Sequence, residues 1–176
     1  MREIHPFQPF VPEECSFLIL GSFPGRNSTS GNTPKDDWYY SAPRNQFWKI
    51  MGELWPGRNL SLLKEKMRLF GDIHMAVTDV ILSCERAGES NLDSNLKQRI
   101  YNTETVESIL SGNHLCAVFC TGKGVAKLFR KHFSNPDGVP VVPLPSPSPA
   151  MFSMTIDEKI KCWRELFLEY GVPLPI

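Results

Sequence analysis

Two loops of this sequence combine residues that could hold a ligand. Gly21-Ser22-Phe23-Pro24-Gly25 follows a short apolar run, and PLPSPSPA, from Pro143 to Ala150, follows another. Glycine lets a ligand approach the backbone closely, and successive N–H groups in such turns bind anions or carbonyl oxygens. Ser146 and Ser148, held between prolines, could keep a phosphate in fixed register. The alternatives are a plain turn that ends a strand and a polyproline segment that binds an SH3-type partner.

A third candidate is WYYSAPRNQFW, which runs from Trp38 to Trp48. It places large aromatic residues around a proline, an arginine and Asn45, where a loop enters a helix. Asparagine is a favoured helix N-cap, and aromatic residues near a helix start, such as Tyr40, commonly pack in the core. Taken singly, each residue is explained more simply by the structural role.

Two further features have weaker functional signals. Lys123 lies in TGKG, which lacks the spacing of a Walker motif, and it begins a basic row that also contains Lys127, Arg130 and Lys131. That row is explained most simply as a solvated helix face, and its functional interpretation is phosphate contact. Asp79 follows an apolar strand and could polarise water, but we favour a strand-end turn or helix cap.

Composition limits the classes of function. The formal net charge is zero, which argues against a protein that binds nucleic acid through bulk charge. The five cysteines form no C-x-x-C pair and have no histidine at ligand spacing, so we expect no metal, no cofactor and a reducing, cytoplasmic location. The N-terminus lacks the apolar core of a signal peptide, and no apolar run is long enough to span a bilayer.

Helices and strands alternate along the chain. Apolar runs predict strands at Phe17–Leu20, Ile73–Val80, Leu115–Cys120 and Val139–Val142. Helical spacing and end signals predict helices at Asn45–Leu54, Leu60–Phe70, Leu92–Ile100 and Thr103–Leu110, with Thr103 as an N-cap. Two more are expected from the TGKG turn to about Phe133 and after a capping box, Thr155 to Glu158.

Continuously apolar strands that alternate with helices are typical of a parallel sheet covered on both faces. We therefore predict one domain over residues 1–176, a three-layer α/β/α domain with a central, mainly parallel four-stranded sheet. Ligands of such sheets bind beyond the carboxyl ends of the strands, where GSFPG and LPSPSPA are expected.

Five motifs occur in this order along the chain: GSFPG, YYSAPRNQFW, TDVILSCERAGESNLDSNLK, TGKGVAKLF and LPSPSPA. No single motif identifies a family, but the five in this order do. Together they resemble the uracil-DNA glycosylase superfamily, over roughly residues 17–165. The branch they resemble most is that of the hypoxanthine-DNA (deoxyinosine) glycosylases, which is similar to the mismatch-specific uracil/thymine-DNA glycosylases around Y-x-x-P-x-N-x-F-W. The resemblance implies the same α/β fold and a DNA repair enzyme that flips a damaged base out of the helix.

The resemblance also implies roles for individual residues. Tyr40 would stack on the flipped base, and Gly21, Ser22, Phe23, Pro24 and Gly25 would form the base pocket. Asn45 would be catalytically important, with an amide that either holds water or pairs with the base edge. Ser146, Ser148 and Lys123 would contact the DNA backbone, and Ala150, Met151 or Phe152 would probe the vacated stack, unless they staple the last helix. The enzyme would be a monomer acting on damaged DNA, a monofunctional glycosylase that leaves an abasic site.

Two positions depart from the related branches. Phe23 and Leu144 stand where the mismatch-specific and uracil enzymes carry polar or acidic groups that activate water or stabilise the departing base. The hypoxanthine branch shares these absences, so we expect hypoxanthine as the substrate. The alternatives are uracil or a G:U or G:T mismatch as substrate, and a catalytically silent module that binds nucleic acid.

Overall fold

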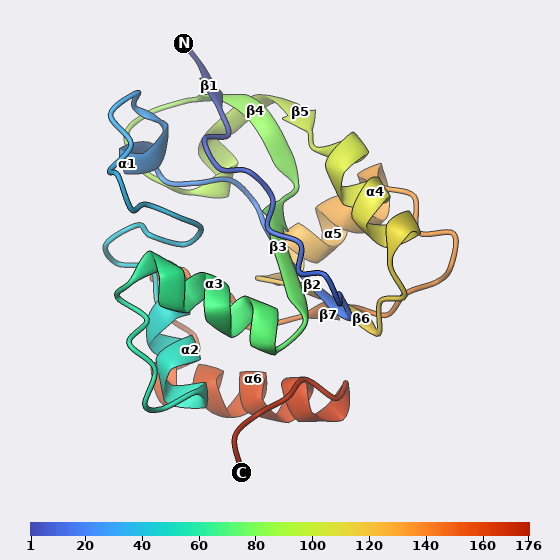
Figure 1. The fold of residues 1–176 in the computed structure, drawn as a ribbon. Coiled ribbons are helices and arrows are strands. Elements are labelled where there is room, and N and C mark those ends of the chain that lie inside the picture. The colour runs from blue at the N-terminus through green and yellow to red at the C-terminus, as the bar shows by residue number, and fades with distance from the viewer.

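The computed structural model describes residues 1–176, and a parallel sheet lies at its centre (Figure 1). Its strands are β2 (Phe17–Gly21), β3 (Met75–Asp79), β6 (Ala117–Cys120) and β7 (Val141–Pro143), in the order β3-β2-β6-β7. All three pairings are parallel. Every residue of β2, β3 and β6 is buried, as expected for strands covered on both sides. The predicted four-stranded sheet is confirmed.

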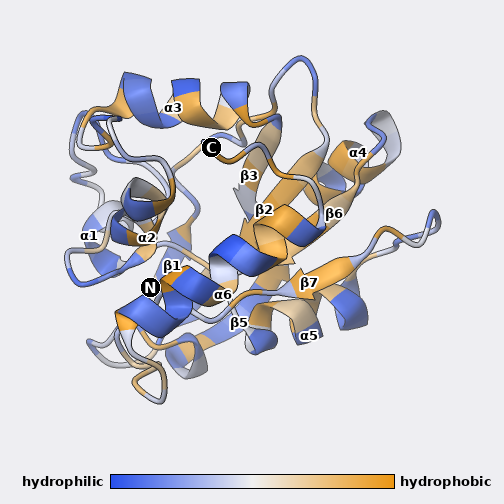
Figure 2. Cartoon of the chain, turned by 90° about the horizontal axis from the view of Figure 1, so that it is seen from below, coloured by the Kyte–Doolittle hydropathy of each residue, from blue (hydrophilic) through white to orange (hydrophobic).

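Alternate residues of the strands enter two separate cores. Phe17 and Ile19 of β2 pack in a core with α2 (Phe47–Leu54), α3 (Leu63–Asp72) and α6 (Ile156–Glu169). Leu18 and Leu20 pack in the other, with α4 (Thr103–Gly112) and α5 (Lys123–His132). The period of two in a strand sends neighbouring side chains to opposite faces. Helices thus cover both faces of the sheet, which confirms the three-layer prediction, and in Figure 2 apolar residues are concentrated in the central strands.

The predicted helices differ mainly at their ends. The helix predicted from Asn45 begins at Phe47, because Asn45 Oδ1 accepts from the Phe47 N–H and stays outside the helix. The helix predicted from Leu60 begins at Leu63, and its cap residue is Leu62. For α4 the cap residue is Asn102, not Thr103. The capping box of α6 is confirmed, with Thr155 and Glu158 bonding each other's backbone.

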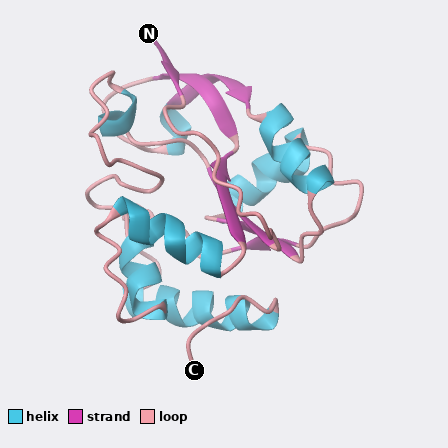
Figure 3. Ribbon diagram, viewed as in Figure 1, coloured by secondary structure: helices cyan, strands magenta, loops and turns pink.

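A second, antiparallel sheet was not predicted (Figure 3). It consists of β1 (Arg2–Ile4), β4 (Ile81–Arg86) and β5 (Leu96–Tyr101), in the order β1-β4-β5. The helix predicted over Leu92–Ile100 is therefore wrong: a short 3-10 turn, Asp93–Asn95, leads into a strand there. Pairing with β4 supplies that strand's backbone hydrogen bonds and overrides the helix-like pattern of the segment.

A short helix, α1 (Arg26–Thr29), follows the GSFPG loop. No helix in the structure has the length and apolar character needed to cross a membrane.

Candidate active site

The predicted loops gather at the carboxyl edge of the parallel sheet. Because β2, β3, β6 and β7 run in one direction, their last residues lie at the same edge, and the register pairs Gly21 with Asp79 and Leu20 with Cys120. GSFPG leaves this edge from β2, the TGKG turn leaves it from β6, and the serine loop Pro143–Ala150 leaves it from β7. The predicted position of GSFPG and LPSPSPA beyond the carboxyl ends of the strands is confirmed.

Gly21 is the point where the backbone approaches this site most closely. A Cβ atom there would collide with Asp79 Oδ1 and would lie 2.8 Å from Tyr40 Oη. Tyr40 Oη is also 3.4 Å from Thr121 Oγ1, at the end of β6. Glycine is therefore required at position 21, since any side chain would occupy the space that Asp79 and Tyr40 fill.

Tyr40 has an unusual backbone and a supported ring. Its φ of 61° lies in the left-handed region, which is uncommon for residues other than glycine and occurs often at functional sites. One face of the ring stacks on Phe47, with centroids 3.8 Å apart and an angle of 4° between the planes. Burial, and next the nearby Asp79 carboxylate, raise the pKa of Tyr40, so its hydroxyl stays protonated.

Asp79 has a partner that sequence reasoning missed. Its Oδ2 lies 2.7 Å from Nε2 of His5, and both side chains are almost entirely buried. A carboxylate only accepts, so Nε2–H donates to Asp79, while Nδ1 lies 3.1 Å from the Phe7 carbonyl oxygen and 3.2 Å from the Phe7 amide nitrogen. Asp79 Oδ1 has no hydrogen-bond partner in the protein. Since every fully buried polar side-chain atom has a partner, Oδ1 is accessible to solvent, and it lies against Gly21.

Asn45 uses only half of its amide within the protein. Oδ1 accepts a hydrogen bond from the Phe47 N–H at 2.9 Å, which fixes the orientation of the amide at the start of α2. Nδ2 donates to no protein atom. Because no fully buried polar side-chain atom lacks a partner, Nδ2 is exposed to solvent and faces outward. Asn45 therefore presents a free donor to whatever binds beside it.

The GSFPG loop is fixed by side chains from β4 and from the segment that joins β4 to β5. Arg86 Nη2 donates to the Pro24 carbonyl at 2.8 Å, and Ser22 Oγ donates to Asp93 Oδ1 at 2.7 Å. Asn91 Oδ1 accepts from the Arg26 N–H at 3.0 Å, and its Nδ2 would lie 3.0 Å from a Cβ at Gly25. This explains the ERAGESNLDSN motif, whose residues hold the loop.

Of the predicted pocket residues, Gly21 and Tyr40 lie together, while Ser22, Pro24 and Gly25 anchor the loop. Phe23 packs beside them: its ring lies 5.8 Å from the His5 ring and 5.9 Å from the guanidinium carbon of Arg86. Phe23 thus reaches the Asp79 side of the site through His5.

The two serine side chains of the serine loop form hydrogen bonds with the loop's own backbone. Ser146 Oγ accepts from the Ser148 N–H and Ser148 Oγ accepts from the Ala150 N–H, both at 3.2 Å, so each hydroxyl hydrogen remains available as a donor. Gly122, with φ 133°, packs against Ser146 and places the exposed Lys123 at the start of α5 next to this loop.

The carbonyl groups of the serine loop bond to α2 and α6. Pro145 O accepts from Trp163 Nε1 at 2.9 Å, and Pro147 O accepts from the Gln46 N–H at 2.9 Å. Leu144 is buried in the core with α2 and α6. A loop integrated in this way contradicts the alternative of a freely displayed ligand for an SH3-type domain.

Phe152, just beyond the loop, is 89% exposed. A residue so exposed packs on nothing, so the alternative in which it staples the last helix is wrong for Phe152.

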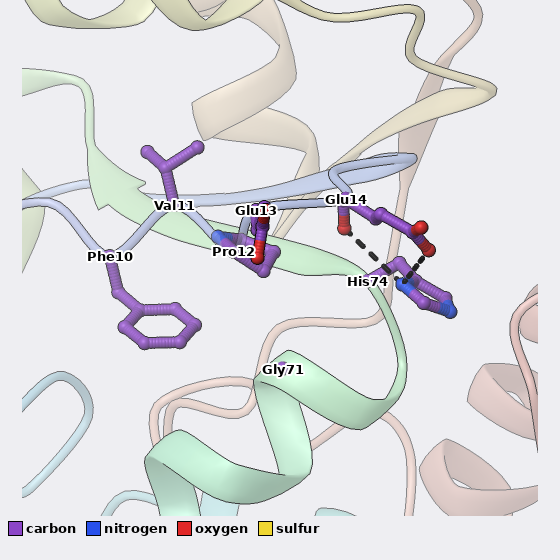
Figure 4. Close-up of a pocket in the computed structure, with 7 residues that line it drawn as sticks. All are labelled: Phe10, Val11, Pro12, Glu13, Glu14, Gly71 and His74. Atoms are coloured by element: carbon purple, nitrogen blue, oxygen red, sulfur yellow. Dashed lines mark hydrogen bonds and ion pairs between the residues drawn. The ribbon is translucent and has the colours of Figure 1, made fainter.

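The other features of the surface do not compete with this site. Figure 4 shows an open hollow lined by Phe10, Val11, Pro12, Glu13, Glu14, Gly71 and His74. It adjoins the residues that precede β2 and β3, at the opposite end of the sheet from Gly21 and Asp79. No group of three or more His, Cys, Asp and Glu side chains is arranged to hold a metal ion.

Comparisons with known proteins identify the family and the fold of this chain. A family model of the uracil DNA glycosylase superfamily matches residues 8–167. A hypoxanthine DNA glycosylase from Methanosarcina barkeri is 28% identical over 115 residues, which cover 64% of this chain and 68% of that protein. The solution NMR structure of a candidate uracil DNA glycosylase from Methanosarcina acetivorans has the same fold, with a TM-score of 0.71, 23% identity, and coverage of 97% of this chain and 99% of that one.

Proposed function

Because this chain belongs to the uracil DNA glycosylase superfamily and is a DNA glycosylase, we propose that it removes a deaminated base, hypoxanthine, from DNA. The enzyme hydrolyses the N-glycosidic bond of a flipped-out deoxyinosine and leaves an abasic site. It acts as a monomer and needs neither a cofactor nor a covalent intermediate. The similarity to a hypoxanthine DNA glycosylase supports this choice of base.

The observations that support the proposal are a free donor on Asn45 and a free acceptor on Asp79, each linked to Tyr40 through its neighbours. Asn45 offers Nδ2–H, and its helix contact joins it to Phe47, on which Tyr40 stacks. Asp79 offers Oδ1, beside the hydroxyl end of the same ring. Hypoxanthine presents a carbonyl, O6, next to an N1–H donor, which matches this pair. Adenine presents an amino donor next to an acceptor, so the undamaged base mismatches both groups.

The same contacts favour bond cleavage. As the glycosidic bond breaks, positive charge develops on the sugar and negative charge on the departing base. The Asn45 N–H donates to O6, where that negative charge accumulates, and one such oriented donor contributes about 3 kcal/mol to transition-state stabilisation. Tyr40 supports the ring by stacking, with its own hydroxyl protonated. The bound base is thereby held in the orientation in which it leaves.

The serine loop and α5 hold the DNA strand around the flipped nucleotide. Backbone phosphates accept hydrogen bonds from the hydroxyl groups of Ser146 and Ser148 and from the ammonium group of Lys123. Phe152 fills the gap that the flipped base leaves in the stack, since it is apolar, exposed and next to this loop.

Uracil is the second candidate substrate, because its O4 and N3–H present the same pattern to Asn45 and Asp79. Phe23 and the buried Leu144 favour hypoxanthine, since neither can activate water or donate to a departing uracil. A silent binding module would keep the pocket and cut nothing.

The test is a panel of labelled duplexes that carry one deoxyinosine, one uracil opposite G or A, one thymine opposite G, or one deoxyadenosine. Strand breaks are measured with and without alkali, and the released base is identified by chromatography. We expect hypoxanthine release with breaks only after alkali, and none from Asn45→Ala. Uracil release instead would change the substrate, breaks without alkali would contradict monofunctional action, and binding without release would support the silent module.

A further inference from the structure

Lys159 is a buried cation that the proposed chemistry does not use. It lies in the first turns of α6, and its exposed fraction is 0%. No carboxylate lies within ion-pair distance of it, although five such pairs occur elsewhere in the molecule. Lysine normally extends its amine to water, because a buried unpaired ammonium is costly. Burial accordingly lowers the pKa of Lys159.

The Lys159 amine joins two parts of the site. Nζ donates to Gln46 Oε1 at 2.8 Å and to the Ser148 carbonyl at 3.3 Å. Gln46 immediately follows Asn45, and its own N–H donates to Pro147 O at 2.9 Å. Ser148 lies in the loop to which we assign phosphate contact. The amine thus bridges the turn that carries Asn45 and the loop that grips DNA.

We propose that Lys159 is a positioning residue that sets the orientation of Asn45 and ties it to the serine loop. A methionine would fill a similar volume without the free-energy cost of burying an unpaired amine. Stability alone therefore does not explain this lysine. Its two bonds instead make Asn45 and Ser148 move as one unit when DNA is bound. The inference rests on the proposed role of Asn45.

The test is a double-mutant cycle in single-turnover excision of hypoxanthine. Lys159→Met should lower the rate about 10- to 100-fold in the native background, because small misplacements of a catalytic group have effects of this size. In the Asn45→Asp background, where the donor is already gone, it should lower the rate less than about twofold. Gln46→Leu should lower the rate in the native background and in the Asn45→Asp background as Lys159→Met does. Gln46→Glu keeps an oxygen acceptor for Lys159, so its rate should be close to that of the native protein.

Lys161→Met is the matched control, because Lys161 is exposed on the same helix, two residues away. It should leave the rate unchanged. Equal losses from Lys159→Met in both backgrounds, or no loss in either, would overturn the proposal. If Lys159→Met does not fold, the Gln46 variants decide in the same way.

A second readout does not depend on the substrate. The side-chain amide resonance of Asn45 in ¹⁵N spectra should shift in Lys159→Met and not in Lys161→Met. An unchanged resonance would overturn the positioning role even if excision fell. If the native protein releases no base, the proposed function fails, and this spectrum still decides whether Lys159 orients Asn45.

Discussion

Asn45 shows that a helix-start role and a binding role need not exclude each other. From sequence they compete, because an asparagine at a helix start is explained by its contact with the backbone. In the structure Oδ1 makes that contact with the Phe47 N–H, which leaves Nδ2 as an outward donor. The structural bond thus determines which end of the amide faces outward, as the proposed contact with the base requires.

Asp79→Asn tests the acceptor of the base pocket. His5 Nε2–H would still require an acceptor, so the new amide oxygen would face His5 and the NH2 group would face the pocket. The pocket would then present two donors, and the N1–H of hypoxanthine would have no partner. We expect single-turnover excision to fall about 100-fold or more. A rate within threefold of native would contradict the role of Asp79 as the acceptor. Thermal melting of the variant is the control for correct folding.

Two substitutions of Tyr40 distinguish the contribution of its ring from that of its hydroxyl group. Tyr40→Phe keeps the ring on Phe47 and removes only the long contact with Thr121, at 3.4 Å. Tyr40→Leu removes the flat surface, and stacking of a base on an aromatic side chain is worth about 1–3 kcal/mol. We expect KM for a deoxyinosine duplex to change little in the first variant and to rise about tenfold or more in the second. Equal behaviour of the two variants would argue against stacking.

At the scale of elements, the central strands were predictable and the small sheet was not. Continuous apolar runs such as FLIL mark strands buried on both faces, so their pattern is local. LKQRIY of β5 is polar and half exposed, its pairing with β4 has register shifts, and Gln98 has φ 50°. Such a strand is determined by its neighbour, which sequence spacing does not show.

The N-terminal strand of that sheet is fixed by one carboxylate. Glu3 accepts from Arg86 and, at 2.6 Å, from Thr29 Oγ1. Burial by itself raises the pKa of Glu3, but these hydrogen bonds outweigh it and leave the pKa below its ordinary value. A lowered pKa in the folded state stabilises the fold above the unfolded value of ~4.3, and this stabilisation is lost as pH falls through the folded pKa.

Glu3→Gln should therefore lower the free energy of unfolding by about 1.5–3 kcal/mol at pH 7. The difference from native should shrink as pH falls from about 5 to 3, where the native carboxyl becomes protonated. Urea denaturation at several pH values measures both. A difference independent of pH would show that the charge of Glu3 contributes nothing.

At the scale of the whole molecule, the site is built from residues far apart in the chain. Gly21, Tyr40 and Asn45 could be found because each lies in a short motif. His5 and Lys159 could not, since their partners lie 74 and 113 residues away, and no local pattern distinguishes them. Sequence reasoning finds loops that converge on a sheet edge, but not the side chains that reach them from other elements.

The zero net charge of the chain limits how it binds DNA. Its exposed basic row, Lys123, Lys127, Arg130 and Lys131, lies along one helix, so few phosphates are contacted. The logarithm of affinity should therefore fall with the logarithm of salt at a shallow slope. Lys123→Ala should reduce that slope by about one, while Lys64→Ala, exposed on α3, should not. An unchanged slope for Lys123→Ala would remove this residue from the DNA contact.

The most direct test of the central claim is the single-turnover rate of hypoxanthine excision by native protein and by Asn45→Asp. Aspartate keeps an acceptor for the Phe47 N–H and so preserves the start of α2, but it cannot donate to the departing base. The donor assignment predicts a loss of about 100-fold or more with unchanged thermal stability. Excision by Asn45→Asp at the native rate would contradict it.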